Sequence, residues 1–208
     1  MPMTFTQLTG AHTTEGSIRN WVNRASVPAE TILTMAEAEI FSRLRVREMR
    51  TRTTLTVAAA ASSVALPTNF LDPISLKDRY KVDLTLTDQD DFEDKCDVDS
   101  DFALIEGDPT FYAIFNEAFN FNTKMEEERQ FTLHYFKQPT ALSGTNETNF
   151  LTTRYPHVLL AGCRMAAELY AKNWTARDQA EKDLLKAIAT IAVNDDLTYR
   201  GAVFSERY

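Results

Sequence analysis

The spacing of apolar residues changes twice along this chain, and these changes limit the folds open to it. From Pro28 to about Val46, apolar side chains recur every three or four residues, the period of a helix with one buried face. Between Met49 and Phe136 the apolar runs are short and rich in threonine, valine and phenylalanine, which is typical of strands. From Pro156 to about Val193 the helical period returns. A helical region interrupted by a β-region predicts an α+β fold.

The two helical regions predict a body of four helices. A short helix is expected from Ser17 to Ala25, followed by a long one that starts at Pro28. In the second region, one helix is expected from Pro156 to about Asn173 and another, capped by Thr175, to about Val193.

The middle region predicts a small β-domain. Pro and Gly turn signals separate its runs, and one short helix, capped by Thr87 and with Phe92 facing inward, is expected over residues 87–95. The strand candidates are residues 49–58, 63–66, 74–76, 82–86, 103–105, 110–115, 118–122 and 129–136.

These expectations divide the chain into segments. They are an extended N-terminal arm over residues 1–15, a helical body over 16–48 and 150–194, an inserted β-domain over 49–149 that holds an acidic segment, and a flexible C-terminal tail over 195–208.

Charge is distributed unevenly along the 208 residues. Residues 61–150 carry 7 basic and 18 acidic side chains, a net charge of −11, in a chain whose net charge is −8. An acidic balance argues against a protein that wraps nucleic acid with its whole surface. The pattern indicates either a basic face and an acidic face or two merely solvated faces. The dense acidic segment holds Asp88, Asp90, Asp91, Glu93, Asp94, Asp97, Asp99 and Asp101, and the dense basic segment holds Arg43, Arg45, Arg47, Arg50 and Arg52.

No enzyme motif is present. The sequence lacks a nucleophile elbow, a phosphate-binding loop, a dinucleotide fingerprint and a zinc-protease motif. His12, His134 and His157 are not spaced as metal ligands, either with one another or with Cys96 and Cys163. We therefore expect no catalytic residue, no cofactor and no metal.

One acidic run superficially resembles a calcium loop. Asp97-Val-Asp99-Ser-Asp101 has the alternating carboxylates, but the sixth and twelfth positions hold Phe102 and Asp108 where such a loop needs Gly and Glu. We interpret the run as exposed carboxylates on a strand edge.

The sequence also bears on the cellular compartment. The N-terminal residues lack the basic and apolar regions of a signal peptide, so we expect none. The uncharged stretch from Thr53 to Leu71 is too polar to span a membrane. Two cysteines are too few for a secreted disulfide scaffold and favour a reducing cytosol.

The arginine run favours contact with a protein. Clusters of arginine side chains bind phosphates or carboxylates. No aromatic residue lies between Phe41 and Phe70, whereas single-strand nucleic-acid binders commonly interleave aromatic side chains with basic ones. A neighbouring copy of the chain offers a matching acidic segment.

At several of these segments the chain resembles the head-to-tail adaptor, or connector, proteins of tailed bacteriophages. The stretch that ends in the arginine run is the most specific. The resemblance rests on Arg19-Asn-Trp21-Val-Asn23-Arg24, Ala36-Glu-Ala-Glu-Ile-Phe-Ser-Arg-Leu-Arg-Val-Arg-Glu-Met49, Ala65-Leu-Pro-Thr-Asn-Phe-Leu-Asp72, and Phe136-Lys-Gln-Pro-Thr-Ala-Leu-Ser143 with Thr148-Asn-Phe-Leu-Thr-Thr-Arg-Tyr-Pro156.

The resemblance implies a structural virion protein without enzymatic activity. Its partners would be the portal protein, a tail, nozzle or tail-completion protein, and further copies of itself in a ring of twelve. Genomic DNA would pass without sequence-specific contact, and no membrane would be involved. The protein would be made in the bacterial host cytoplasm and lie in the neck of the virion, where it extends the DNA channel and provides the platform for the tail.

Two sets of residues then become site candidates. The five arginines, together with Tyr199, Phe204 and Tyr208 of the tail, are candidates for the subunit or portal interface. The eight carboxylates between Asp88 and Asp101 are candidates for an acidic channel wall that repels the DNA backbone.

Three alternatives remain open from sequence alone. The first is a nucleic-acid-binding packaging or accessory module that uses the arginines from Arg43 to Arg52. The second is another neck or tail completion protein. The third is an enzyme of unrecognised type.

Overall fold

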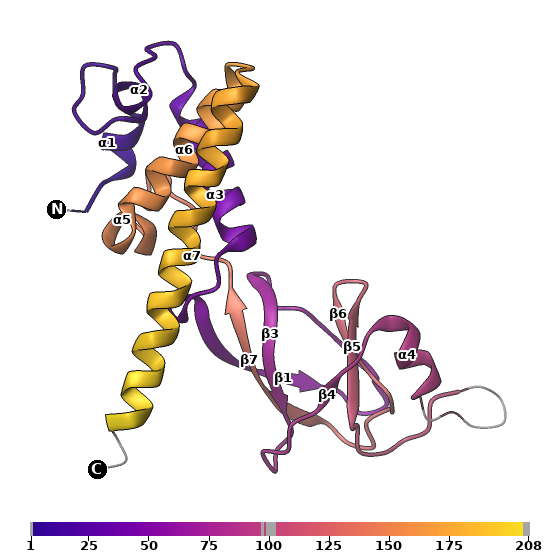
Figure 1. The fold of residues 1–208 in the computed structure, drawn as a ribbon. Helices are drawn as coiled ribbons and strands as arrows, with labels where there is room; N and C mark the ends of the chain where they lie inside the picture. The colour runs from indigo at the N-terminus through magenta and orange to yellow at the C-terminus, as the bar shows by residue number, and fades with distance from the viewer. Residues whose placement is uncertain (1, 97, 99–102, 206–208) are drawn as a thin grey trace. The chain divides into compact units, whose positions relative to one another are not determined.

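The computed structural model describes residues 2–96, 98 and 103–205, with the backbone alone described for residues 194–205. The chain divides into two compact units (Figure 1). A helical unit is formed by Met1–Glu48 and Pro139–Tyr208, and a β unit by Met49–Gln138. The expected α+β class is confirmed.

Six α-helices belong to the helical unit in the described part of the chain, where four were expected. They are α1 (Phe5–Thr9), α2 (Ile18–Trp21), α3 (Ala29–Arg43), α5 (Phe150–Arg154), α6 (Pro156–Tyr170) and α7 (Trp174–Ser205), and the 3₁₀ turn η1 (Arg47–Met49) follows α3. The extra helices, α1 and α5, are too short to show a helical period in the sequence.

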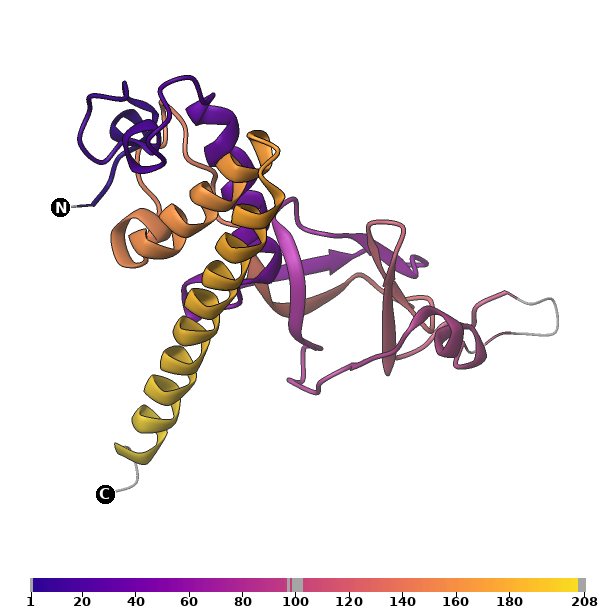
Figure 2. The same ribbon diagram turned by 45° about the horizontal axis from the view of Figure 1, so that its top comes forward.

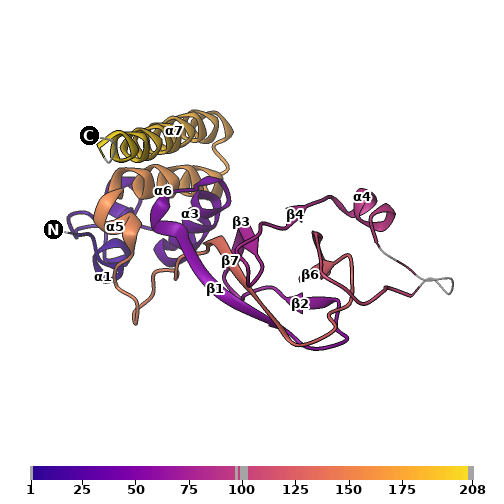
Figure 3. The same cartoon turned by 90° about the horizontal axis from the view of Figure 1, so that it is seen from below.

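Helix α6 packs against both α3 and α7, and Figure 3 shows α7 lying along α6. Its apolar face is buried, including Leu159, Cys163 and Ala166. Gly162 allows a close approach to α3, because a Cβ at this position would lie 3.0 Å from Ile40 Cδ1.

A buried carboxylate fixes the point at which the chain returns to the helical unit. Glu37 of α3 is only 3% exposed. Its carboxylate accepts a hydrogen bond from the backbone N–H of Leu142, at 3.1 Å from Oε2, and one from Nδ2 of Asn149, at 2.7 Å from Oε1. Loop 139–149 therefore belongs to the helical unit, and the β unit ends at Gln138 rather than at residue 149, where we had expected its end.

Asn149 acts a second time, as the N-cap of α5. Its side-chain oxygen accepts hydrogen bonds from the amides of Leu151 and Thr152, while the Thr152 hydroxyl accepts one from the Asn149 amide, which completes a capping box. One asparagine thus links Glu37 of α3 to the start of α5.

The expected extended arm over residues 1–15 is wrong, because residues 5–9 form α1. Thr4 caps this helix, and Leu8 is fully buried. The Thr6 amide and hydroxyl donate to the Glu147 carboxylate, and these bonds lower the pKa of Glu147. Contacts with a distant loop therefore order the segment, and a local sequence pattern cannot show such contacts.

The C-terminal region also differs from expectation. Helix α7 does not end near Asn194 but continues to Ser205, so residues 195–205 are helical rather than a flexible tail. Asn194-Asp-Asp196 contains neither Gly nor Pro, the residues that stop a helix most strongly. The helix also starts at Trp174, one residue before the expected cap Thr175. The side-chain oxygen Oδ1 of Asn173, rather than Thr175, accepts a hydrogen bond from the amide of Ala176.

The β unit contains two sheets. One is antiparallel with the strand order β1-β7-β3, and the other has the order β2-β6-β5-β4, in which β4 pairs with β5 in parallel. Figure 2 shows the strands from a second direction. The strands are β1 (Arg50–Val57), β2 (Ser63–Ala65), β3 (Phe70–Lys77), β4 (Thr85–Leu86), β5 (Phe111–Phe115), β6 (Ala118–Phe121) and β7 (Arg129–Lys137), and the unit also holds helix α4 (Gln89–Asp94).

Aromatic side chains from both sheets form the core of the β unit. The rings of Phe121 on β6 and Phe131 on β7 stack at 4.9 Å between centroids. Phe70 on β3 meets Phe119 on β6 edge to face at 5.4 Å. These contacts join the two sheets into a single core.

Three local expectations in this unit need correction. Residues 82–86 form only the two-residue β4 and an isolated bridge from Asp83 to Lys77, and Val82 is exposed. Residues 103–105 make only isolated bridges, since Leu104 pairs with Val98 alone. Helix α4 is capped by Asp88 rather than Thr87, although Phe92 is buried as expected.

Replacing Glu37 tests whether its carboxylate holds loop 139–149 in the helical unit. Glu37→Ala leaves the Leu142 amide and the Asn149 side chain buried without their acceptor. We expect the free energy of unfolding to fall by about 1–3 kcal/mol. Circular dichroism at 222 nm during thermal unfolding measures this loss, because the helices dominate that signal. A melting temperature equal to that of the wild type would contradict the assignment.

The pH dependence of stability provides a second test of Glu37. Burial raises the pKa of Glu37 above its ordinary value of 4.5, and the bonds from Leu142 and Asn149 oppose the rise. The folded state therefore holds the proton more tightly than the unfolded state does. As pH rises from about 4.5 through the raised pKa, wild-type stability should fall relative to Glu37→Gln. If the stability of the wild type minus that of Glu37→Gln stayed constant or rose with pH over this range, the expectation would be contradicted.

The turn between α6 and α7 gives a third prediction. Lys172 has a φ of 55°, in the left-handed region that favours glycine, and its neighbour Asn173 donates to the carbonyl of Glu168 to close the helix end. Lys172→Gly should raise the free energy of unfolding by about 1 kcal/mol. Lys182→Gly, a loss of the same side chain inside α7, should lower it, and chemical denaturation measures both changes.

Candidate functional site

The five candidate arginines do not form one row. Arg43 ends α3, Arg45 follows it and Arg47 begins η1, so these three belong to the helical unit. Arg50 and Arg52 lie on β1 in the β unit. The run that looks continuous in sequence is thus divided between two structural units.

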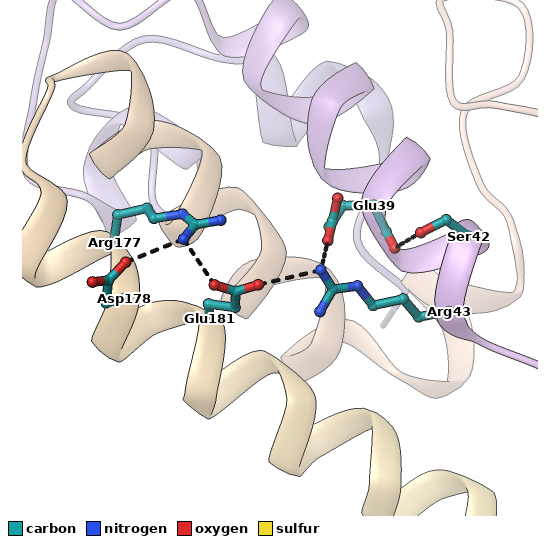
Figure 4. Close-up of polar contacts among 6 residues, drawn as sticks. All are labelled: Glu39, Ser42, Arg43, Arg177, Asp178 and Glu181. Atoms are coloured by element: carbon teal, nitrogen blue, oxygen red, sulfur yellow. Dashed lines mark hydrogen bonds and ion pairs between the residues drawn. The ribbon is translucent and has the colours of Figure 1, made fainter.

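Arg43 is held within the helical unit by an ion-pair network (Figure 4). Its guanidinium pairs with Glu39 one turn earlier on α3, and its Nη2 lies 3.2 Å from Glu181 Oε1 on α7. Arg177 on α7 pairs with the other oxygen of Glu181 at 2.8 Å, and with Asp178 at 3.1 Å. Arg43 therefore links α3 to α7, which is an internal role.

The other arginines have different surroundings. Nη1 of Arg45 donates to the carbonyls of Phe41 and Leu44, both at 2.8 Å, and so satisfies groups at the end of α3. Arg47 is exposed. The guanidinium of Arg50 lies 5.6 Å from the ring centroid of Phe136, a cation–π distance.

Arg50 and Arg52 share the outer face of β1. Both side chains are exposed and two residues apart, and the register places Arg52 opposite His134 of β7. Of the five candidates, these two combine exposure with a position on the edge strand of a sheet.

The described part of the acidic segment lies on α4 and its cap. Asp88, Asp90, Asp91, Glu93 and Asp94 are all exposed. Asp88 caps the helix by accepting the Asp91 amide, and Lys95 lies 3.4 Å from Asp91 Oδ2. Asp97, Asp99 and Asp101 lie outside the described residues.

Helix α4 is anchored by its single apolar residue. Phe92 packs against Phe115 of β5, with 5.8 Å between the ring centroids. The carboxylates therefore stay on the exposed surface of a helix whose position in the β unit is fixed.

The aromatic candidates of the C-terminal region lie at the end of α7 or beyond it. Tyr199 and Phe204 belong to the helix, whose side chains are not described at those positions. Tyr208 lies outside the described residues.

Sequence reasoning missed an apolar surface on the β unit. Ile74, Val82 and Leu86 are 45%, 60% and 48% exposed, although strands were expected over residues 74–76 and 82–86. Ile74 and Leu86 line a shallow groove between β3 and β4. The available signal was Pro73, because proline inside a strand is confined to a sheet edge or a bulge, where packing is incomplete.

The groups that could support chemistry are dispersed. Within the described ranges, no three His, Cys, Asp or Glu side chains are grouped so as to hold a metal ion. Cys163 is buried on α6, and burial together with the nearby Glu37 carboxylate raises the pKa of its thiol. Among the described residues, none of the helices is both long and apolar enough to cross a membrane.

The chain matches a family of known proteins along almost its whole length. The family described as SU10 adaptor protein matches residues 3–204, almost the whole chain, and the match includes the acidic segment and most of the C-terminal helix. No curated protein matches the chain. The chain belongs to the SU10 adaptor protein family, a family of phage head-to-tail adaptors.

Proposed function

We propose that this chain is a structural adaptor that assembles as a closed ring of twelve copies beneath the portal of a tailed phage. The ring extends the DNA channel and provides the attachment platform for the tail, nozzle or tail-completion protein. The observation that carries the proposal is the family match over residues 3–204. In this role the protein performs no catalysis, is made in the host cytoplasm and ends up in the neck of the virion.

The proposed portal contact lies at the end of α7. This helix has 32 residues and α6 has 15, so at about 1.5 Å per residue α7 is roughly 25 Å longer than the helix it packs against. Figures 1 and 2 show its C-terminal part extending beyond α6. Tyr199, Phe204 and Tyr208 are the proposed anchors, since aromatic residues dominate the energetics of protein interfaces.

The proposed channel wall includes the acidic residues of α4. Five exposed carboxylates on one short helix and its cap would repel the phosphates of passing DNA and limit adhesion. Such a wall needs no sequence-specific contact.

The nucleic-acid alternative gains no support from the arginines. Arg43 pairs with Glu39 and Glu181, and Arg45 binds helix carbonyls. The exposed arginines, Arg47, Arg50 and Arg52, are divided between the two units, so the five do not belong to one structural element. We therefore do not propose that function.

Electron microscopy of a mixture with the cognate portal ring tests the proposal. We expect symmetric density added as a collar at one end of the portal, with the portal alone and the protein alone as controls. An undecorated portal in the presence of folded protein would contradict the proposal.

Point variants of α7 test the portal anchors without shortening the helix. Tyr199→Ala combined with Phe204→Ala should weaken portal binding at least about tenfold, as expected for two interface anchors. Val193→Ala, which removes an exposed apolar side chain earlier on the same helix, should bind as the wild type does. Equal binding by all three proteins, measured by sedimentation with the portal, would remove the anchor assignment.

The channel-wall assignment makes a separate prediction. Changing Asp90, Asp91, Glu93 and Asp94 to their amides should leave the collar intact but raise the affinity of the assembled ring for short duplex DNA at low salt. A control variant with Asp178→Asn and Asp183→Asn, which removes two carboxylates from α7, should not raise this affinity. Unchanged DNA affinity of the α4 variant, or density for α4 on the outer rim of the collar, would contradict the assignment.

A further inference from the structure

Among the described residues the two strand orders leave four edge strands, β1 and β3 in one sheet and β2 and β4 in the other, and the edges at β1 and β4 differ in chemistry. Strands β1 and β4 each end the strand order of their sheet. An edge strand presents backbone groups that can pair with another chain, and native proteins usually cover or protect such edges.

The edge at β4 opens into the groove described above. Strands β3 and β4 are joined at one end, where the Leu84 amide donates to the Leu76 carbonyl at 2.8 Å and Lys77 bridges to Asp83. Away from this junction, Ile74 and Leu86 line the groove and remain about half exposed. An apolar groove beside an open strand edge suits an extended segment of another chain.

The groove lies in acidic surroundings. Asp83 lines it and is 59% exposed at its side chain, with Lys77 at 3.0 Å as its partner. The exposed carboxylates of α4, including Asp88 and Asp90, follow β4 directly in the chain and outnumber Lys95. Residues 77–95 as a whole carry seven acidic and four basic side chains, so this segment has a net charge of −3.

The edge at β1 carries positive charge, opposite to that of the groove. Arg50 and Arg52 are exposed on its outer face, at the end of the strand remote from the connection to β2. Every residue of β1 has a backbone N–H, whereas β3 contains Pro73. Strand β1 can therefore pair as an added strand and present positive charge while doing so.

We propose that β1 of one copy lies along the groove between β3 and β4 of the next copy, with Arg52 beside Asp83 on the outer face. This contact rests on the proposed ring function. It joins two different surfaces, so it is heterologous, and repetition of such a contact closes into a ring when the rotation permits. A two-fold contact of either edge with itself would bring like charges together.

Concentration-dependent NMR of the full chain tests this contact without the portal. Between about 20 μM and about 1 mM, where even weak contacts populate, the amide signals of β1 and of the groove should shift together. Arg52→Glu should reduce these shifts several-fold, because it faces Asp83 with a like charge. Lys186→Glu, the same charge change at an exposed site on α7, should leave them as in the wild type.

A charge exchange makes the test specific. Asp83→Arg alone should also reduce the shifts, and losing its exposed pair with Lys77 should cost little stability. Mixing labelled Arg52→Glu with unlabelled Asp83→Arg should restore the shifts, since each contact between the two variants then joins opposite charges.

Three results would overturn the proposal. The first is that the amide signals of β1 or of the groove do not shift with concentration in the wild type. The second is that Arg52→Glu leaves these shifts unchanged. The third is that mixing the two variants does not restore them. Because the portal is not used, a failure here is distinct from a failure of the portal-binding proposal.

Discussion

The carboxylate of Glu37 joins the two parts of the helical unit that the inserted β unit separates in sequence. It lies in the buried face of α3 and accepts bonds from Leu142 and Asn149, more than a hundred residues later. The same asparagine caps α5, and Pro156, two residues after α5 ends, begins α6, which packs against α3 through Gly162. Burying an acid costs free energy, and the raised pKa of Glu37 is the sign of that cost.

This arrangement explains how a β unit can be inserted into a helical unit. The chain leaves the helical unit after α3 and returns to it through loop 139–149. Glu37 holds this loop against α3, the helix after which the chain left. Each unit then has its own core, aliphatic around α6 and aromatic between the two sheets.

The sequence predicted the long helices and most strands, because their apolar periods are long or well bounded, as in α3, α6 and β7. It failed where contacts distant in sequence determine the local structure. Helix α1 is ordered by burial of Leu8 and by bonds to Glu147, and loop 139–149 is held in the helical unit by Glu37. It also identified the charged segments but not their use, since the partner of Arg43, Glu181, lies 138 residues away. The exposed groove at Ile74 and Leu86 was missed because alternation alone does not tell a covered strand from an open edge.

The most direct test of the adaptor account is a cryo-electron microscopy reconstruction of the neck of the intact virion. We expect a single closed ring of this chain between the portal and the tail, with the C-terminal end of α7 against the portal. Density for this chain elsewhere in the particle, or a neck in which the portal meets the tail without it, would contradict the account.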